Sequence, residues 1–312
     1  MIPSSSSSHV VFGAGPVARS VVASLTARGV RPVVVTRSGV KIPDSVSVRA
    51  DISDVSAATV VLAGAEVVYQ CAQPAYQCWP QEFPALQASV LHAARSSGAL
   101  LVAAENLYGY APPTTPLTED LPLTAKTRKG AIRAAMWQQL EAAHRSGDVR
   151  VVAARASDFF GPGVAVSTVG DRFFGPLLAD KTVRVLGDPD FLHTYTYVGD
   201  FGEALVRLSE SPVTWGSAWH VPNSPTITTR QFAERAAAIA GTTATLRPVA
   251  DWQLRLIGAF VPAVREMREM RYEFDRDWVV SHDRYVSVLG DHATPLDEAL
   301  RATVASRSPE RR

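Results

Sequence analysis

A short apolar run that ends in two closely spaced glycines constrains the fold of this chain more than any other feature. Val10 to Phe12 lead into Gly13-Ala14-Gly15-Pro16-Val17-Ala18, and Pro16 to Arg28 then carry apolar residues at helical spacing. Gly29 suits the end of that helix, and Val33 to Thr36 form a second, β-branched run. Strand, glycine turn, helix and strand predict a βαβ unit, so the sheet begins parallel.

The same alternation continues along the first half of the chain. Further strands are expected at 46–49, 67–71, 100–104 and 149–154, and helices at 55–63, 82–97 and 129–145. These strands are nearly all apolar, which is typical of strands buried on both faces by helices. The predicted class is α/β, a doubly wound parallel sheet with a smaller C-terminal lobe.

After Gly161 the pattern becomes less regular. We expect strands at 196–198 and 218–221, helices at 228–240 and 295–304, and two short helices within 252–273. The sheet domain is therefore assigned to residues 1–160, with 190–222 rejoining it. Residues 161–189 and 223–312 form the lobe, in which 251–276 is predicted to be a helical flap.

Composition excludes several classes of function. The chain has 312 residues, 46% of them hydrophobic, and a net charge of +1, which gives no general attraction to nucleic acid. Cys71 and Cys78 fit no disulfide framework or zinc pattern and are expected to be free thiols, so no metal is predicted. No apolar run is long enough for a membrane span, and Met1 to His9 lack the features of a signal peptide. We expect a cytoplasmic monomer or homodimer that binds a small molecule.

The glycine motif has the chemistry of a phosphate cradle. Gly13 permits a tight turn, Gly15 lets a phosphate approach the backbone, and Ala18 allows the helix to pack closely on the strand. The free N–H groups at the start of the helix then face the anion. The motif lies at the first strand-to-helix junction of a βαβ unit, so it predicts dinucleotide binding rather than a merely structural turn.

The residues after the second strand favour NADP(H) over NAD(H). An NAD enzyme usually has an acidic residue here, whereas this chain has Thr36-Arg37-Ser38. A guanidinium pairs well with a 2′-phosphate, and Arg19 can join it. The alternative is that Arg37 is only solvated. Asp51, after the third strand, is placed to accept from the adenine amino group or to act as a helix cap, although Ser53 and Asp54 are better caps.

With these residues in place, the chain resembles an extended short-chain dehydrogenase/reductase of the epimerase/dehydratase-like kind, a Rossmann-type fold. The resemblance spans nearly the full length. Its other carrying residues are Leu107-Tyr108-Gly109, Arg155 with Gly161-Pro162-Gly163, Tyr197-Val198-Gly199-Asp200 and Ala293-Thr294-Pro295-Leu296. The resemblance implies cofactor contacts at Gly13, Gly15, Pro16, Val17, Ala18, Thr36, Arg37, Ser38, Asp51, Ile52, Cys71, Ala72, Gln73, Ala103, Lys129, Ala156, Ser157 and Phe159.

The family's catalytic residues are missing. Ala104 falls where family members have a Ser or Thr. In the stretch that usually reads Tyr-x-x-x-Lys, Lys129 takes the tyrosine position and Arg133 the lysine position. The chain therefore resembles the atypical members of the family.

Two routes for protonating a reduced carbonyl stay open. One uses another protein acid, for which Tyr108, Lys129 and His193 are candidates, although a packed structural role is the favoured interpretation of Tyr108 and His193. The other uses a phenol or enol of the substrate beside its ketone, so that the enzyme only aligns hydride donor and ketone. The resemblance and the aromatic residues predict substrate contacts at Tyr76, Trp79, Glu105, Tyr108, Asp158, His193 and Tyr195.

These residues predict an NADPH-dependent ketoreductase acting on a bulky aromatic, polyketide-like substrate. Among the atypical members of the family, the chain resembles the angucyclinone ketoreductases of simocyclinone-type antibiotic biosynthesis, and it is this resemblance that implies such a substrate. One alternative is a nucleotide-sugar epimerase or dehydratase, and another is a non-catalytic NADP(H)-binding sensor.

Overall fold

The computed structural model describes residues 9–114, 116–260 and 268–307. The chain divides into two compact units. The first comprises Met1–Gly109, Leu123–Arg155 and Phe201–Trp219, and the second comprises Tyr110–Pro122, Ala156–Asp200 and His220–Arg312.

The centre of the first unit is a sheet that has, within the described residues, seven strands in the order β11-β6-β5-β4-β1-β2-β3. They are β1 (His9–Phe12), β2 (Val33–Thr36), β3 (Val46–Arg49), β4 (Val67–Gln70), β5 (Leu100–Asn106), β6 (Val151–Ala156) and β11 (Ala218–His220). All pairings from β3 through β2, β1 and β4 to β5 are parallel. This Rossmann-type α/β class is the one the sequence predicts, and the order places the carboxyl ends of β1, β4 and β5 side by side.

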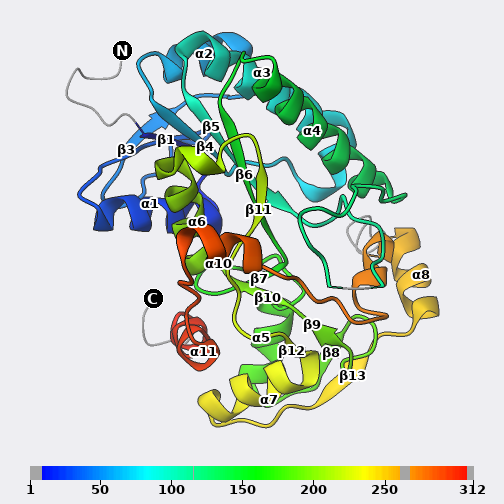
Figure 1. Ribbon diagram of the computed structural model, residues 1–312. Coiled ribbons are helices and arrows are strands. Elements are labelled where there is room, and N and C mark those ends of the chain that lie inside the picture. Colours follow the sequence, from blue (N-terminus) through cyan, green and yellow to red (C-terminus); the bar gives the residue numbers. More distant parts are fainter. Residues whose placement is uncertain (1–8, 115, 261–267, 308–312) are drawn as a thin grey trace. The chain divides into compact units, whose positions relative to one another are not determined.

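Helices cover both faces of this sheet (Figure 1). They are α1 (Pro16–Ala27), α2 (Val55–Leu62), α3 (Trp79–Ser97), α4 (Arg128–Arg145) and α6 (Val198–Glu210), with short 3-10 turns at η1 (Tyr76–Cys78) and η2 (Pro212–Thr214). The apolar sides of α2, α3 and α4 form one core with alternate residues of the strands, such as Val10, Phe12 and Leu101. Because side chains alternate along a strand, Tyr69 of β4 faces the other way, and its hydroxyl lies 2.8 Å from Ser209 Oγ on α6.

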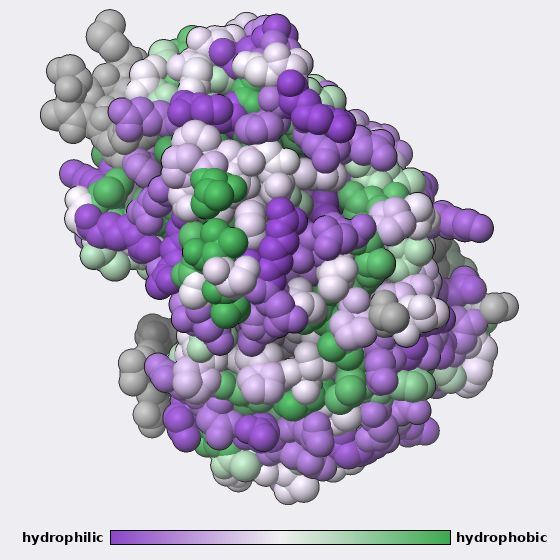
Figure 2. All heavy atoms as spheres, in the orientation of Figure 1, coloured by the Kyte–Doolittle hydropathy of each residue, from purple (hydrophilic) through white to green (hydrophobic). Residues whose placement is uncertain are grey.

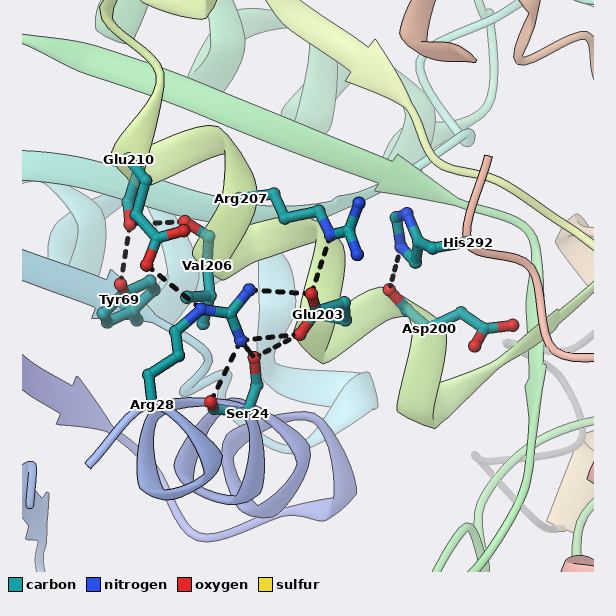
Figure 3. A network of polar contacts seen from close by, with 10 residues as sticks. Ser24, Arg28, Tyr69, Asp200, Glu203, Val206, Arg207, Glu210 and His292 are labelled. Atoms are coloured by element: carbon teal, nitrogen blue, oxygen red, sulfur yellow. Dashed lines mark hydrogen bonds and ion pairs between the residues drawn. The ribbon is translucent and has the colours of Figure 1, made fainter. Parts of the chain in front are cut away.

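Charged residues join α1 to α6 on that second face (Figure 3). The Arg28 guanidinium donates to both carboxylate oxygens of Glu203, at 2.8 and 2.7 Å, and Arg207 Nε donates to the same carboxylate at 2.7 Å. Ser24 adds a 2.6 Å hydrogen bond. These bonds lower the pKa of the Glu203 carboxyl, that to Arg28 most. Close packing accompanies them, because a Cβ at Gly202 would lie 2.2 Å from Ser20 Oγ.

The second unit is built from short strands and helices. Its strands are β7 (Asp158–Phe160), β8 (Val183–Val185), β9 (Leu192–His193), β10 (Tyr195–Tyr197), β12 (Ile227–Thr228) and β13 (Leu246–Pro248). Its helices are α5 (Asp171–Leu178), α7 (Thr229–Ala240), α8 (Asp251–Phe260), α10 (Asp283–Leu289) and α11 (Leu296–Ala305), with a 3-10 turn η3 (Arg271–Glu273). Phe160, Phe174 and Phe232 form the middle of its apolar core.

Several local signals in the sequence explain where these elements begin and end. Thr228 and Gln231 form a reciprocal capping box at the start of α7, and Gly241 ends that helix in a left-handed conformation. The strand expected at 218–221 is β11, at the edge of the large sheet. In contrast, β10 pairs in parallel with β7 in a separate two-stranded sheet. Of the predicted flap, Asp251–Phe260 is helical, and residues 261–267 lie outside the described residues.

Hydrophilic residues cover most of the face shown in Figure 2, and hydrophobic residues form small separate areas. The most exposed large apolar side chains, such as Val60, Val166 and Val213, are far apart in sequence. Single exposed apolar residues are normal on protein surfaces and mark no partner. Among the described residues, no helix has both the length and the apolar character needed to cross a membrane.

Candidate functional site

The glycine turn after β1 packs against the protein at Gly13 and has free space at Gly15. Gly13 has φ +106°, a conformation that favours glycine, and a Cβ there would lie 3.1 Å from the Ala72 backbone nitrogen. Gly15 is the N-cap residue of α1, and a Cβ there would meet nothing within 4 Å. No side chain caps this helix, so its first N–H groups are available to an anion. The turn therefore has the shape and polarity needed to hold the pyrophosphate of a dinucleotide.

An exposed arginine, Arg37, follows the end of β2, the strand that pairs with β1. Thr36 Oγ1 accepts hydrogen bonds from the backbone N–H groups of Gly39 and Val40, at 2.9 and 3.2 Å, which closes the loop after the strand. The carbonyl of Arg37 accepts from Arg49 Nε at 3.1 Å, whereas the Arg37 side chain is exposed to solvent. The backbone of Arg37 is thus braced while its guanidinium stays available to a phosphate.

Asp51 and Asp54 were both candidates for capping α2, and they accept hydrogen bonds from different groups. Asp54 caps α2 by accepting from the N–H groups of Ser56 and Ala57, at 2.8 and 3.2 Å. Asp51 accepts from the hydroxyl and N–H of Ser53 at 2.7 and 3.0 Å, and these two bonds lower the pKa of its carboxyl. The predicted preference for Asp54 over Asp51 as the cap is confirmed.

The chain that follows β4 forms the wall behind the glycine turn. The Cys71 N–H donates to the Phe12 carbonyl at 3.1 Å, which keeps this segment against β1. Burial raises the pKa of the Cys71 thiol to about 12, so the thiol is neutral at physiological pH. Cys71 and Cys78 are both free cysteines.

An aromatic cluster follows the same sheet edge. We define it as Tyr76, Trp79, Phe83 and Tyr108. The Trp79 ring lies 5.1 Å from the ring of Tyr76, 5.1 Å from that of Phe83 and 6.0 Å from that of Tyr108, centroid to centroid. Trp79 and Phe83 are buried, and Tyr76 and Tyr108 are partly buried. Trp79 and Phe83 form a small buried core with Met136, against which Tyr76 and Tyr108 pack.

Lys129 lies on the first turn of α4, against this aromatic cluster. Its side chain is fully buried, and its Nζ lies 4.4 Å from the centroid of the Tyr76 ring. The N-cap residue Thr127 accepts from the Gly130 N–H at 3.1 Å. A Cβ at Gly130 would lie 2.4 Å from the Tyr108 carbonyl oxygen, so only glycine lets the helix start so close to Tyr108. These contacts fix Lys129 relative to both tyrosines.

Arg133, one helical turn later, is held by the end of β5. Its Nη2 lies 3.5 Å from Glu105 Oε1 and donates to the Ala104 carbonyl at 3.3 Å. Its guanidinium also lies 4.9 Å from the centroid of the Phe83 ring. Burial lowers the pKa of Arg133, and the charge of Glu105 opposes that effect.

Glu105 binds a second guanidinium as well. Its Oε2 accepts from Arg155 Nε of β6 at 3.1 Å, and Arg155 in turn stacks on Trp137 at 5.2 Å. Glu105, predicted as a substrate contact, therefore interacts with two buried arginines, Arg133 and Arg155. Sequence reasoning had not paired these three residues, because they come together only when β5, β6 and α4 pack.

A separate polar cluster lies in the second unit. His193 Nε2 is 3.0 Å from Asp158 Oδ2, and Thr168 donates to Asp158 Oδ1 at 2.7 Å. The His193 ring stacks on Phe274 with centroids 4.5 Å apart. Glu273, which sequence reasoning did not single out, is buried here, and burial raises the pKa of its carboxyl well above the usual range, with the charge of Asp158 adding to the effect.

The other predicted site residues of the second unit have structural partners. The Tyr195 hydroxyl lies 2.8 Å from Thr229 Oγ1 within the apolar core, which favours a packing role over the predicted substrate contact. The Ser157 N–H donates to Thr196 Oγ1 at 3.1 Å. The remaining predicted site residues lie in the first unit, apart from Ala156, Asp158, Phe159 and His193 in the second.

A family profile described as the NAD-dependent epimerase/dehydratase family matches residues 10–220 of the sequence. This match spans more than half of the chain and includes the glycine turn, the aromatic cluster, Lys129 and Arg133. The chain belongs to the NAD-dependent epimerase/dehydratase family. Family membership indicates a nicotinamide dinucleotide as the cofactor class and an oxidoreductase-like enzyme. Among curated proteins, none matches the chain.

Solved structures of epimerases and dehydratases share the fold. The dTDP-glucose 4,6-dehydratase DesIV from Streptomyces venezuelae has a TM-score of 0.79 at 18% identity, with 97% of each chain covered. The UDP-N-acetylglucosamine 4-epimerase from Bacillus cereus has a TM-score of 0.77 at 14% identity, with 96% of each chain covered. The UDP-glucose 4-epimerase from Thermus thermophilus has a TM-score of 0.75 at 21% identity, covering 96% of this chain and 98% of that one. At these identities the likeness establishes the fold of this family member and no more.

Proposed function

We propose that this family member is a ketoreductase, which transfers a hydride from NADPH to a ketone. The observation that carries the proposal is that a glycine turn shaped for a dinucleotide occurs together with altered catalytic positions. Lys129 stands where the family has its tyrosine, and Arg133, where the family has its lysine, is bonded to Ala104 and paired with Glu105. The glycine turn keeps the geometry needed for a dinucleotide.

The residues at the catalytic positions support ketone reduction over oxidation of a sugar hydroxyl. Oxidation of a sugar hydroxyl, on which epimerases and dehydratases depend, requires a base that removes the hydroxyl proton. Reduction of a ketone requires only a proton source and stabilisation of the new oxyanion. A buried ammonium or a phenol on the substrate supplies these, whereas the pair of phenol and amine that serves as the family's base is absent here.

The cofactor proposed is NADP(H). The exposed Arg37 follows β2, and no acidic residue occupies positions 36 to 38. A carboxylate there would repel a 2′-phosphate, whereas a guanidinium forms charge-assisted hydrogen bonds with it.

The substrate proposed is a bulky aromatic ketone with a neighbouring phenol, as in polyketides of the angucyclinone type. Tyr76 and Tyr108, the partly buried members of the aromatic cluster, follow β4 and β5 at the sheet edge that carries the glycine turn, and their rings support an aromatic substrate. Alignment of ketone and hydride donor alone lowers a barrier by roughly 7–11 kcal/mol. Reduction during antibiotic biosynthesis is consistent with such a substrate.

The second candidate is a nucleotide-sugar epimerase or dehydratase. Family membership and the likeness to DesIV and the two epimerases favour this candidate more than they favour a polyketide ketoreductase. It requires Lys129 or another group to act as the base in place of the family's tyrosine.

One experiment separates the candidates. The purified protein is mixed with NADPH or NADH and a panel of aromatic ketones with and without a neighbouring hydroxyl, and in parallel with UDP- and dTDP-hexoses. The proposal expects that NADPH is oxidised and that at least one ketone gives a product about two mass units heavier than the ketone, the mass of one added H₂. Conversion of a nucleotide sugar instead would establish the second candidate, and NADPH binding without any turnover would establish a sensor.

A further inference from the structure

The first turn of α1 offers fewer backbone donors to an anion than a helix start without proline. Pro16 is the first helical residue and has no N–H group. The N–H of Arg19 is already bonded to the Gly15 carbonyl at 3.0 Å. The N–H groups of Val17 and Ala18 therefore remain for the ligand. A pyrophosphate can accept more hydrogen bonds than these two groups donate, so a side-chain donor would complete the site.

The guanidinium of Arg19 is tethered to the glycine turn itself. Arg19 Nε donates to the carbonyl of Ala14, the residue between the two glycines, at 3.1 Å. A guanidinium is a rigid planar fork of N–H donors, so a bond at Nε holds the remaining donors close to the turn. The bond also offsets the partial negative charge of that carbonyl, which otherwise opposes an anion at the turn.

The remaining donors of Arg19 are not used within the protein. Its side chain is exposed and, among the described residues, makes no other hydrogen bond and no ion pair. The first turn of α1 also contains no acidic residue that would compete for the guanidinium. At the other end of the same helix, Arg28 is by contrast paired with Glu203 (Figure 3). An exposed arginine alone identifies no ligand, but one tethered to a phosphate-binding turn has a defined place to act.

We infer that Arg19 binds the pyrophosphate of the dinucleotide and supplies the N–H donors that Pro16 cannot. Arginine forms short, charge-assisted hydrogen bonds with phosphate oxygens. Both NAD(H) and NADP(H) contain the pyrophosphate, so Arg19 contributes to the affinity for either cofactor and not to the choice between them. That choice is left to Arg37 after β2, whereas the sequence suggested that Arg19 joins Arg37 at the 2′-phosphate. The inference rests on the proposed binding of a nicotinamide dinucleotide.

Calorimetric titration of variants tests this role without turnover. NADPH carries both the pyrophosphate and the 2′-phosphate, whereas NADH and ADP-ribose carry the pyrophosphate without the 2′-phosphate. Arg19→Met removes the charge and keeps an unbranched side chain of high helix propensity, and Arg19→Lys keeps the charge without the planar fork. The control, Arg31→Met, removes an exposed arginine that precedes β2, at the sheet edge opposite the glycine turn. Urea unfolding establishes that each variant is folded.

Arg19→Met is expected to weaken the binding of NADPH, NADH and ADP-ribose by the same factor, at least about tenfold, as for a lost hydrogen bond to a charged group. Arg19→Lys is expected to lose less, and Arg31→Met to match the wild type. Arg37→Ala is expected to weaken NADPH alone. A loss confined to NADPH in Arg19→Met would place Arg19 at the 2′-phosphate and overturn the inference. Unchanged affinities in Arg19→Met, or an equal loss in Arg31→Met, would also overturn it.

The salt dependence separates a direct contact from a purely structural role. If Arg19 only braced the turn through the Ala14 carbonyl, the loss in Arg19→Met would not depend on ionic strength. An exposed guanidinium that pairs with a phosphate is instead screened by salt. The ratio of the dissociation constants of Arg19→Met and wild type for ADP-ribose is therefore expected to fall as KCl is raised from about 0.05 M to about 0.5 M. A constant ratio overturns the direct contact.

Failure of this inference is distinguishable from failure of the proposed function. All of these measurements are of binding, so they do not depend on whether any ketone is reduced. A wild-type protein that prefers NADH overturns the proposed cofactor choice, while ADP-ribose still reports on Arg19. Equal affinities of the wild type and Arg19→Met overturn the inference and leave the ketoreductase intact. A wild type that binds none of these ligands overturns the proposed cofactor and the inference together.

Discussion

Glu105 Oε2 of β5 accepts a hydrogen bond from Arg155 Nε of β6 at 3.1 Å, and both side chains are only 4% exposed. The same carboxylate lies 3.5 Å from Arg133 on α4. One buried anion therefore ties two adjacent strands and the helix that carries the altered catalytic positions. Removal of one member of such a group leaves uncompensated charge in the interior.

Replacement of this carboxylate is expected to destabilise the fold strongly. Glu105→Gln removes the anion that two buried guanidinium groups share and is expected to lower the free energy of unfolding by about 3–5 kcal/mol. Urea denaturation measures the change. The control is Glu141→Gln, which breaks the exposed pair of Glu141 with Arg145 and is expected to cost less than about 0.5 kcal/mol. Equal effects of the two changes would show that the buried group contributes no more than a surface pair.

A methyl group at Gly15 is expected to impair cofactor binding without impairing the fold. A Cβ there meets no protein atom within 4 Å, so the free energy of unfolding of Gly15→Ala is expected to stay within about 1 kcal/mol of wild type. The methyl group occupies space that a pyrophosphate needs, and we expect at least tenfold weaker NADPH binding by calorimetry. Gly175→Ala, in α5, also meets nothing within 4 Å and serves as the control. Unchanged affinity in Gly15→Ala would exclude this turn as the phosphate site.

The exposed guanidinium after β2 is expected to determine the choice of cofactor. Arg37→Ala removes charge-assisted hydrogen bonds to a 2′-phosphate, and we expect it to weaken NADPH binding by about 1.5–3 kcal/mol while NADH binding is unchanged. The matched variant Arg31→Ala removes another exposed arginine, which lies before β2. The measurement is the ratio of the two dissociation constants at fixed ionic strength. If Arg37→Ala weakened both cofactors equally, Arg37 would be a general electrostatic contributor.

Burial of Glu273 is expected to give stability a characteristic pH dependence. Its pKa is raised in the folded state, so above about pH 4.3, the ordinary value for glutamate, the unfolded chain releases a proton that the folded chain retains. The free energy of unfolding therefore falls as the pH rises from there towards the raised pKa, by up to about 1.4 kcal/mol per pH unit. Glu273→Gln cannot ionise and is expected to remove this slope.

Urea denaturation between pH 5 and 8 measures the slope for wild type and Glu273→Gln, where that interval lies above the ordinary glutamate pKa of about 4.3. Glu234→Gln, on the exposed side of α7, is the control and is expected to keep the wild-type slope. An identical slope in wild type and Glu273→Gln would show that Glu273 is charged in the folded protein.

The first half of the fold could be predicted from the sequence because its signals are local. The glycine turn, the β-branched runs and the helical spacing of Val21, Val22 and Leu25 each depend on neighbours within a few residues. Apart from β10, which lies close to the strand expected at 196–198, the short strands of the second unit carry no such signal. β9 and β12 have two residues each and exist only because Ile227 and Thr228 pair with His193 and Leu192 far away in the sequence.

In the candidate site, too, the features that depend on local sequence could be predicted, and those that depend on tertiary packing could not. The cradle was predictable because glycine at positions 13 and 15 has a direct conformational meaning. The loss of the catalytic set was readable from Ala104, Lys129 and Arg133 by resemblance. The contacts of Arg133 could not be predicted, because Glu105, Arg133 and Arg155 come together only when β5, β6 and α4 pack. The burial of Glu273 beside Asp158 is likewise a property of tertiary packing alone.

The shared carboxylate of Glu105 also constrains how this protein can change over generations. Replacing Arg133 alone with the family's usual lysine would exchange a planar fork of donors for a single point charge beside a buried carboxylate. Replacing Glu105 alone would remove the anion that both buried guanidinium groups share. Substitutions at Glu105, Arg133 and Arg155 are therefore expected to be non-additive, so that a change at one position alters which residues the fold tolerates at the other two.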